Sequence, residues 1–211
     1  MMPNNKFIPA PHGQLEYIID TPKEIKHADT IMVICHPHPL HEGSMYNKVV
    51  TTLSRAAREM GIPALRFNFR GVQQSTGSYG EGRGELEDLH TVVDWLQANS
   101  PEQKIILAGF SFGGSVAYKG CLELKNVTHL ITIAPAIVNF PVNEYPEPTV
   151  PWLTIQGNDD DVVSPQAVLQ WLTQSITTPY HLITMNDVGH FFHGRLIELR
   201  KEIESFLQPR F

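Results

Sequence analysis

The sequence contains little cysteine and few positive charges. Its 211 residues include only two cysteines, Cys35 and Cys121, too few for the disulfide framework of a small secreted domain, and we expect both to be buried thiols. The 16 lysines and arginines are outnumbered by 22 acidic residues, which gives a net charge of −6. Because no basic run is available to neutralise phosphates, the composition excludes nucleic acid as a partner.

Long apolar runs are also missing. No stretch approaches the length of about 20 residues that a membrane-spanning helix needs, so we expect no membrane partner. Residues 1–6 lack the apolar segment of a signal peptide, and we therefore expect a cytoplasmic protein. The sequence does not indicate an oligomeric state.

What the sequence does contain is a regular alternation of short apolar runs and amphipathic segments. After a predicted hairpin, strands are expected at 31–35, 64–67, 105–108, 130–134, 152–156 and 180–184, and helices at 49–60, 86–96, from 164 onward and 195–206. Continuously apolar strands separated by helices predict an α/β fold in one domain, residues 1–211. Its sheet should be mostly parallel and covered by helices on both faces.

One motif stands directly between a predicted strand and a predicted helix. It is Gly109-Phe110-Ser111-Phe112-Gly113, a G-x-S-x-G pattern in the setting of a nucleophile elbow. The tight turn strains the serine backbone, and the flanking glycines leave room where a Cβ would collide. The following helix directs its N–H groups at the same place. Because the pattern also occurs by chance, partners elsewhere in the chain decide its meaning.

A serine hydroxyl needs a base, and the base needs a carboxylate to orient it. Asp159, Asp160 and Asp161 follow one predicted strand, and His190 follows the next. The carboxyl ends of parallel strands meet at one edge of a sheet, so these groups are expected near Ser111. Their order along the chain, Ser then Asp then His, is that of α/β hydrolases.

The motifs together carry a resemblance to a known family. They are HPHPL at 36–40, GSM at 43–45, RFNFRGV at 66–72, the elbow at 109–113, residues 155–163 and GHFFHG at 189–194. The chain resembles α/β hydrolases, and more narrowly a compact bacterial group of predicted α/β-superfamily hydrolases. The resemblance implies an α/β-hydrolase fold with Ser111 as nucleophile, His190 as general base and the N–H of Phe112 as one oxyanion donor. One departure is Gln73, which stands where related sequences usually carry glycine.

The resemblance also selects among the three aspartates. The family pattern places the acid three residues after a glycine and three before a valine, which matches Asp160 between Gly157 and Val163. Asp161 is the next candidate and Asp159 the last. The two that are not the acid are expected to be solvated loop charges.

A second oxyanion donor is expected from the loop after the strand 31–35, as in esterases. Prolines have no N–H, so the prolines of the HPHPL run leave the backbone N–H groups of His38 and Leu40. We favour His38, because the His-Pro pair before it stands where many hydrolases have His-Gly and the donor usually follows.

The same loop contains His36, His38 and His41, a spacing similar to the zinc-binding run of metallo-β-lactamase-like enzymes. That run has aspartate before its last histidine, where this chain has Leu40, and the sequence offers no distant ligands at suitable spacing. We therefore predict no metal and no cofactor. The three histidines are interpreted as groups that shape the loop or line the substrate site.

Residues beside the predicted catalytic groups are candidates for contact with a small-molecule substrate. They are Leu40, Phe110, Phe191 and His193. The alternative for the aromatic residues is a place in the core, and for His193 a structural role at the entry to the last helix. Arg66 and Arg70 either orient an anionic substrate or tie loops together by salt bridges, and we favour salt bridges.

The predicted function is hydrolysis of a small ester or related acyl substrate through an acyl-enzyme. A thioesterase and an aminopeptidase-like enzyme are alternatives, because the same triad cleaves several acyl bonds. A non-catalytic binding protein of the same fold is the alternative from another class. The connection 135–151, with Pro141, Pro146 and Pro148, is too short for a helical lid, so we expect an open site and no long-chain lipase activity.

Overall fold

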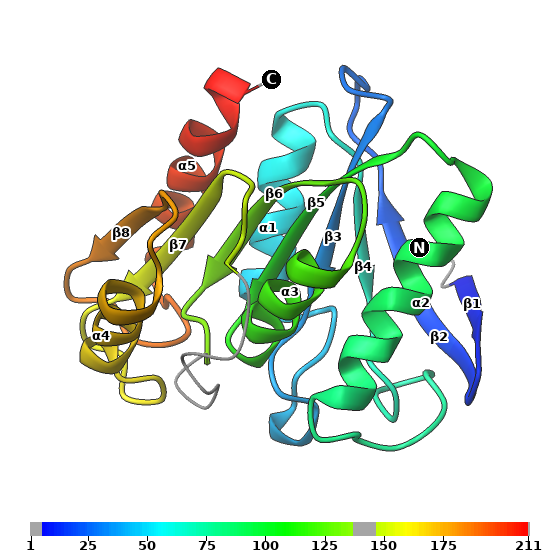
Figure 1. Ribbon diagram of the computed structural model, residues 1–211, viewed down its shortest axis with the longest axis horizontal. Helices are drawn as coiled ribbons and strands as arrows, with labels where there is room; N and C mark the ends of the chain where they lie inside the picture. The colour runs from blue at the N-terminus through cyan, green and yellow to red at the C-terminus, as the bar shows by residue number, and fades with distance from the viewer. Residues whose placement is uncertain (1–5, 137–146, 211) are drawn as a thin grey trace.

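The computed structural model describes residues 6–136 and 147–210. Its centre is an eight-stranded sheet with the strand order β1-β2-β4-β3-β5-β6-β7-β8 (Figure 1). The strands are β1 (Lys6–Ala10), β2 (Gly13–Asp20), β3 (Thr30–Cys35), β4 (Ala64–Phe67), β5 (Lys104–Phe110), β6 (Val127–Ile133), β7 (Trp152–Gly157) and β8 (His181–Met185). β2 pairs antiparallel with β1 and with β4, and all other neighbours are parallel. The predicted hairpin and the mostly parallel sheet are both confirmed.

Helices cover both faces of this sheet. They are α1 (Lys48–Glu59), α2 (Arg83–Asn99), α3 (Phe112–Glu123), α4 (Pro165–Ser175) and α5 (Leu196–Leu207), with short 3-10 turns η1 (Pro39–His41) and η3 (Gln208–Arg210). Buried side chains of α2, α3 and α4 belong to one apolar cluster, and those of α1 and α5 belong to another. Figure 1 shows α2, α3 and α4 in front of the sheet.

The strands are apolar on both sides because both sides are covered. Along β3, Ile31, Val33 and Cys35 pack into the cluster of α2, α3 and α4, whereas Met32 and Ile34 pack into the cluster of α1 and α5. Side chains alternate between the two faces of a strand, so a strand between two helical layers has no polar face. This is the physical reason for the continuous apolar runs in the sequence.

Element ends follow local signals in the sequence. Ser164 caps α4 by accepting a hydrogen bond from the Ala167 N–H at 3.3 Å, and Gly61 follows α1 with a φ of 77°. β6 begins earlier than predicted, at Val127, because its first residues pair with β5 around an irregularity in register. Cys35 and Cys121 are free thiols; Cys35 is buried, as predicted, whereas Cys121 is only partly buried.

The connection between β6 and β7 is short. Residues 137–146 of it, including Pro141 and Pro146, lie outside the described residues. β6 ends at Ile133 and β7 begins at Trp152, and a connection of that length has no room for a helical cap domain. The fold is therefore that of an α/β hydrolase without a sizeable cap.

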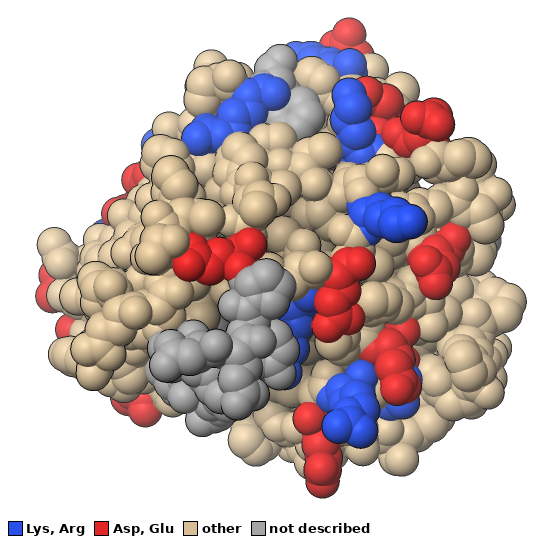
Figure 2. Space-filling model, viewed as in Figure 1, with Lys and Arg blue, Asp and Glu red and all other residues tan. Residues whose placement is uncertain are grey.

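Charges of both signs are mixed on the surface. Figure 2 shows Lys and Arg side chains interspersed with Asp and Glu on the face in view, so this face has no field of one sign that would attract a polyanion. In the part of the chain that the structure describes, no helix combines the length and the apolar character of a membrane span.

Candidate active site

Ser111 occupies a strained turn between β5 and α3. Its backbone has φ 55° and ψ −121°, a conformation that L-residues rarely adopt. A Cβ on Gly109 would overlap the backbone carbonyl of Gly113, and a Cβ on Gly113 would overlap the carbonyls of Cys35 and His36. The two glycines therefore allow the sharp turn and let the first turn of α3 lie against the end of β3.

A chain of hydrogen bonds joins three buried side chains from separate loops. The Nε2 of His190 lies 3.0 Å from the Oγ of Ser111, and its Nδ1 lies 2.8 Å from the Oδ2 of Asp160. A carboxylate can only accept, so Nδ1 donates and Nε2 is left to accept the serine proton. The structure thus brings together the three residues predicted as nucleophile, base and acid. This arrangement is the one that activates a serine hydroxyl.

Among the three adjacent aspartates, only Asp160 points into this chain. Its Oδ1 accepts the N–H groups of Val162 and Val163 at 2.9 and 2.7 Å, and its Oδ2 also accepts from the Nε2 of Gln156 at 2.9 Å. Asp159 and Asp161 are exposed. Burial alone would raise the pKa of the Asp160 carboxyl, but the hydrogen bond from His190 and those from the backbone lower it below its usual value.

Aromatic side chains surround the ring of His190. Phe110 is fully buried and lies 4.9 Å from the His190 ring, between centroids. It therefore belongs to the core beneath the base, and its prediction as a substrate contact is wrong, because a fully buried side chain has no surface to offer. Phe191 is 45% exposed, with its ring 5.1 Å from that of His190 and 5.8 Å from that of the exposed His193. Contact of Phe191 and His193 with substrate stays a prediction.

His36 shapes the loop that follows β3. Its Nε2 accepts the N–H of Phe69 at 3.0 Å, so Nδ1 carries the proton and donates to the carbonyl of Pro37 at 2.6 Å. Burial lowers the pKa of His36 to about 3. Because both ring nitrogens hold the backbone, His36 has none available for a metal, which agrees with the loop-shaping interpretation.

The two candidates for the second oxyanion donor differ in their hydrogen bonds. The Leu40 N–H donates to the Nδ1 of His38 at 3.2 Å. Within residues 6–136 and 147–210, no acceptor contacts the N–H of His38 or that of Phe112. The His38 and Phe112 rings lie 5.0 Å apart, so the loop after β3 and the start of α3 are neighbours. This favours His38 over Leu40, whose 67% exposed side chain stays a predicted substrate contact.

The far end of the same loop is held by residues whose role was not predicted. The Met45 N–H donates to the Oδ1 of Asn68 at 2.8 Å, and the Met45 carbonyl accepts from Arg66 at 2.6 Å. Arg66 also pairs with Asp20 at 2.6 Å, so the salt-bridge interpretation of this arginine agrees with the structure. The RFNFR segment, which carried part of the family resemblance, thus fixes both ends of the loop from His36 to Met45.

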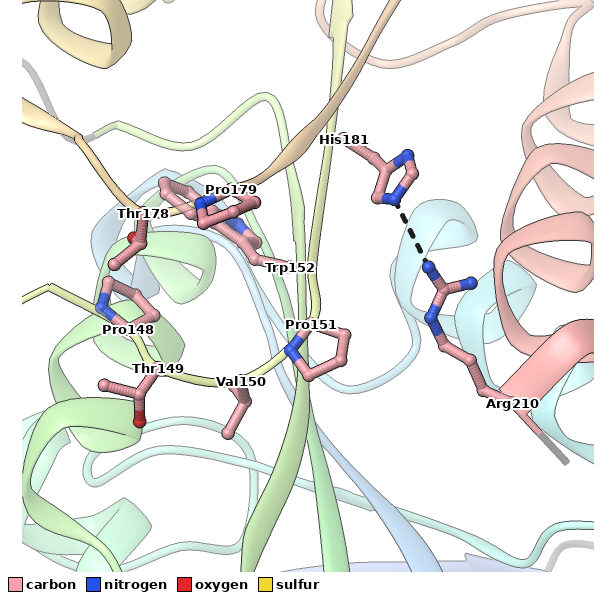
Figure 3. Close-up of a pocket in the computed structure, with 9 residues that line it drawn as sticks. All are labelled: Pro148, Thr149, Val150, Pro151, Trp152, Thr178, Pro179, His181 and Arg210. Carbon is pink, nitrogen blue, oxygen red and sulfur yellow. Dashed lines mark hydrogen bonds between the residues drawn. The ribbon is translucent and has the colours of Figure 1, made fainter.

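A pocket away from these residues is shown in Figure 3. It measures about 450 Å³ and has apolar walls that include Pro148, Pro151 and Pro179. Arg210 reaches it and donates a hydrogen bond to the Nε2 of His181 at 3.2 Å. β7 and β8 begin beside this pocket, whereas Ser111 and its partners follow strand ends, so the two places lie at opposite edges of the sheet.

Known proteins match the chain over most of its length. A family model for serine aminopeptidase, S33, matches residues 26–143. The structure of an α/β serine hydrolase homologue from Coxiella burnetii is 42% identical with a TM-score of 0.89, covering 98% of this chain and 99% of its own. XC6422 from Xanthomonas campestris, an α/β serine hydrolase without a lid, is 38% identical with a TM-score of 0.92, covering 98% and 94%. RP471 of Rickettsia prowazekii is 33% identical over 186 residues, 84% of this chain and 78% of its own length.

Proposed function

The chain belongs to the serine aminopeptidase S33 family of hydrolases, and within this family we propose that it cleaves a small ester through a Ser111 acyl-enzyme. The observation that carries this proposal is the buried chain of hydrogen bonds from Asp160 through His190 to Ser111, at 2.8 and 3.0 Å. The strained turn presents Ser111 beside two backbone N–H groups for which the described residues provide no acceptor, and this supports the proposal. We also assign the protein to the compact group that shares its HPHP and GHFFHG motifs.

The proposed reaction begins with Ser111. His190 Nε2 takes the hydroxyl proton while Oγ forms a bond to the substrate carbonyl carbon, and the carbonyl oxygen becomes an oxyanion. The N–H groups of Phe112 and His38 would hold this oxyanion. The ionised Asp160 stabilises the imidazolium through Nδ1. His190 then gives its proton to the leaving oxygen as the bond to the carbonyl carbon breaks.

Water completes the proposed cycle. His190 takes a proton from a water molecule whose oxygen attacks the acyl carbon, and the same proton returns to Ser111 Oγ as the acyl group leaves as a carboxylic acid. The chain's own residues and water account for every proton and every bond in this scheme. No cofactor or metal is part of the proposal.

An ester is favoured over a peptide with a free amino terminus. An aminopeptidase needs a carboxylate to hold the substrate ammonium group. Two buried carboxylates near the described site are already engaged: Asp160 as above, and Glu85 by the N–H groups of Gly80 and Gly82 at 2.8 and 2.7 Å. Parallel assays with a p-nitrophenyl ester, a thioester and an aminoacyl p-nitroanilide separate the three reactions, and we expect turnover of the ester to be fastest.

The proposed nucleophile is tested by covalent labelling. A fluorophosphonate probe should label the wild-type protein once, on the peptide that contains Ser111, and Ser111→Ala should abolish both labelling and ester turnover. Ser115 is a matched control, because it lies one turn along α3, is 2% exposed and resembles Ser111 in chemistry. Ser115→Ala should keep both. Absence of labelling in the wild type would contradict the proposal and favour a non-catalytic binding protein.

A further inference from the structure

Three half-buried rings lie together beside the two proposed oxyanion donors. The ring of His38 lies 4.9 Å from that of Tyr79 and 5.0 Å from that of Phe112, and the Tyr79 and Phe112 rings are 6.1 Å apart. The interplanar angles are 40–55°. We call His38, Tyr79 and Phe112 the ring cluster. Two of its members are the residues whose backbone N–H groups would bind the oxyanion.

Neighbouring groups hold two members of the ring cluster in place. The Phe112 ring meets the buried Phe69 ring edge to face, with centroids 6.0 Å apart and an angle of 88°. His38 is fixed at its Nδ1 by the Leu40 N–H. The rings therefore lose little conformational freedom when a ligand covers them.

Tyr79 comes from the glycine-rich loop after β4, and this loop is fixed on both sides of the ring. Before Tyr79, the side chain and N–H of Arg70 bond to the buried carboxylate of Asp88 at 2.8–3.0 Å. After it, Glu85 accepts the N–H groups of Gly80 and Gly82. Two buried carboxylates thus position a side chain that is itself not part of the proposed triad.

The proposed mechanism assigns different sides of the substrate to different surfaces. His190 must reach the leaving oxygen to protonate it, so the leaving group lies on the side of His190, where Phe191 is exposed. The acyl group is the remaining substituent on the carbonyl carbon. With the oxygen held by His38 and Phe112 and the leaving group at His190, the ring cluster offers the acyl group an aromatic surface beside the oxyanion donors.

We propose that the ring cluster binds the acyl group, that preferred substrates carry a flat aromatic or conjugated acyl group, and that Tyr79 determines this specificity. The inference rests on the proposed function. Rings inclined to one another offer a flat group both stacked and edge contacts, which a flexible alkyl chain of equal area cannot make. An aromatic acyl group also loses fewer rotatable bonds on binding than an alkyl chain does.

The first experiment uses the unmodified protein. Boronic acids bond to the serine oxygen and place their carbon substituent where the acyl group lies. Inhibition of p-nitrophenyl butyrate hydrolysis should be about tenfold stronger with phenylboronic acid than with butylboronic acid. Equal inhibition, or stronger inhibition by the alkyl compound, would overturn the specificity proposal while leaving the proposed function intact.

The second experiment assigns the two surfaces by exchanging one half of the substrate at a time. Tyr79→Ala should lower kcat/KM for p-nitrophenyl benzoate about tenfold more than for p-nitrophenyl butyrate, and Tyr79→Phe should keep the wild-type ratio because the ring remains. Phe191→Ala is the matched control. It should leave the benzoate-to-butyrate ratio unchanged and alter the ratio between p-nitrophenyl and methyl esters of one acid.

Labelling of Ser111 by the fluorophosphonate probe is measured for every variant. An equal loss for benzoate and butyrate in Tyr79→Ala, with labelling retained, overturns the role of Tyr79 and not the proposed function. A change of the acyl ratio in Phe191→Ala overturns the assignment of the two sides. Failure of the wild type to label overturns the proposed function and this inference with it.

Discussion

The two edges of the sheet differ in what they contain. The edge at the carboxyl ends of the parallel strands has Ser111, His190 and Asp160, all buried and joined by hydrogen bonds of 2.8 and 3.0 Å. The opposite edge has the pocket of about 450 Å³ at Arg210 and His181. Among the residues that line this pocket, no nucleophile is joined to a base. A cavity alone therefore does not identify a catalytic site, whereas coupled proton donors and acceptors do.

Backbone strain marks the same difference. Eight non-glycine residues in the described ranges have positive φ, and all except Asn126 lie in loops at the carboxyl edge: Glu42, Gln73, Glu81, Ser111, Ala134, Asp187 and Phe192. Such conformations cost about 1–3 kcal/mol each and persist only where the surroundings enforce them. The structure concentrates this cost at the edge where the proposed chemistry takes place.

The largest effect is expected from a change of the proposed acid at the carboxyl edge. Asp160→Asn should lower kcat by about 10⁴-fold, because an amide donor facing Nδ1 favours the wrong tautomer of His190. Steady-state kinetics with p-nitrophenyl butyrate measures the loss. The matched control is Asp161→Asn on the neighbouring exposed residue, which should stay within about twofold of the wild type. A larger loss in Asp161→Asn than in Asp160→Asn would contradict the assignment.

A smaller effect is expected from an ion pair near the opposite edge. Burial would raise the pKa of Asp20, but its bonds to Arg66 and Ser54 and the charge of Arg66 lower it below the usual value. A carboxyl with a lowered pKa stabilises the fold above its unfolded-state pKa, and this stability is lost as the pH falls through the folded-state pKa. Asp20→Asn should therefore be less stable than the wild type at pH 7.

Urea unfolding at pH values from 7 to 3 measures this effect. The difference between wild type and Asp20→Asn should shrink steadily toward the acid end, while ester turnover of the variant at pH 7 stays within about twofold. A difference that does not change with pH would show that the charge of Asp20 has no part in it. The expected pH-dependent difference, with turnover unchanged, would show that loss of a carboxylate charge affects stability at one edge and catalysis at the other.

The smallest effect is expected at the large pocket. Arg210→Ala removes its cation and its bond to His181, and kcat/KM for p-nitrophenyl butyrate should change by less than about twofold. Differential scanning calorimetry should be run in parallel, because Arg210 also lies over the Phe206 ring at 4.0 Å. A loss of activity of tenfold or more at unchanged stability would show that the opposite edge, where this pocket lies, takes part in catalysis.

The sequence predicted features that depend on nearby residues. The strands, the helix start at Ser164 and the turn at Ser111 are encoded by short apolar runs, a capping side chain and paired glycines, and each could be identified without the rest of the chain. Asp160 was predicted through the family spacing. The structure adds the reason, because only this aspartate points toward His190.

Features that depend on packing could not be predicted in the same way. Phe110 and Phe191 are both aromatic neighbours of predicted catalytic residues, yet one is fully buried and the other 45% exposed. The bonds of Asn68 to Met45 and the contact of Tyr79 with His38 join loops that are distant in sequence. Gln73 adopts a φ of 51°, a conformation that usually favours glycine, and the sequence alone does not show that the loop keeps its shape with glutamine there.

His36 and the proposed base His190 have two different tasks that one histidine could not combine. A base must gain and lose a proton in every cycle, whereas the Nε2 of His36 must stay unprotonated to accept the Phe69 N–H. With the pKa of His36 lowered to about 3, that bond survives mild acid. A brief exposure to mild acid should therefore leave the loop intact. Activity should then return within the mixing time of a jump to neutral pH, without a refolding phase.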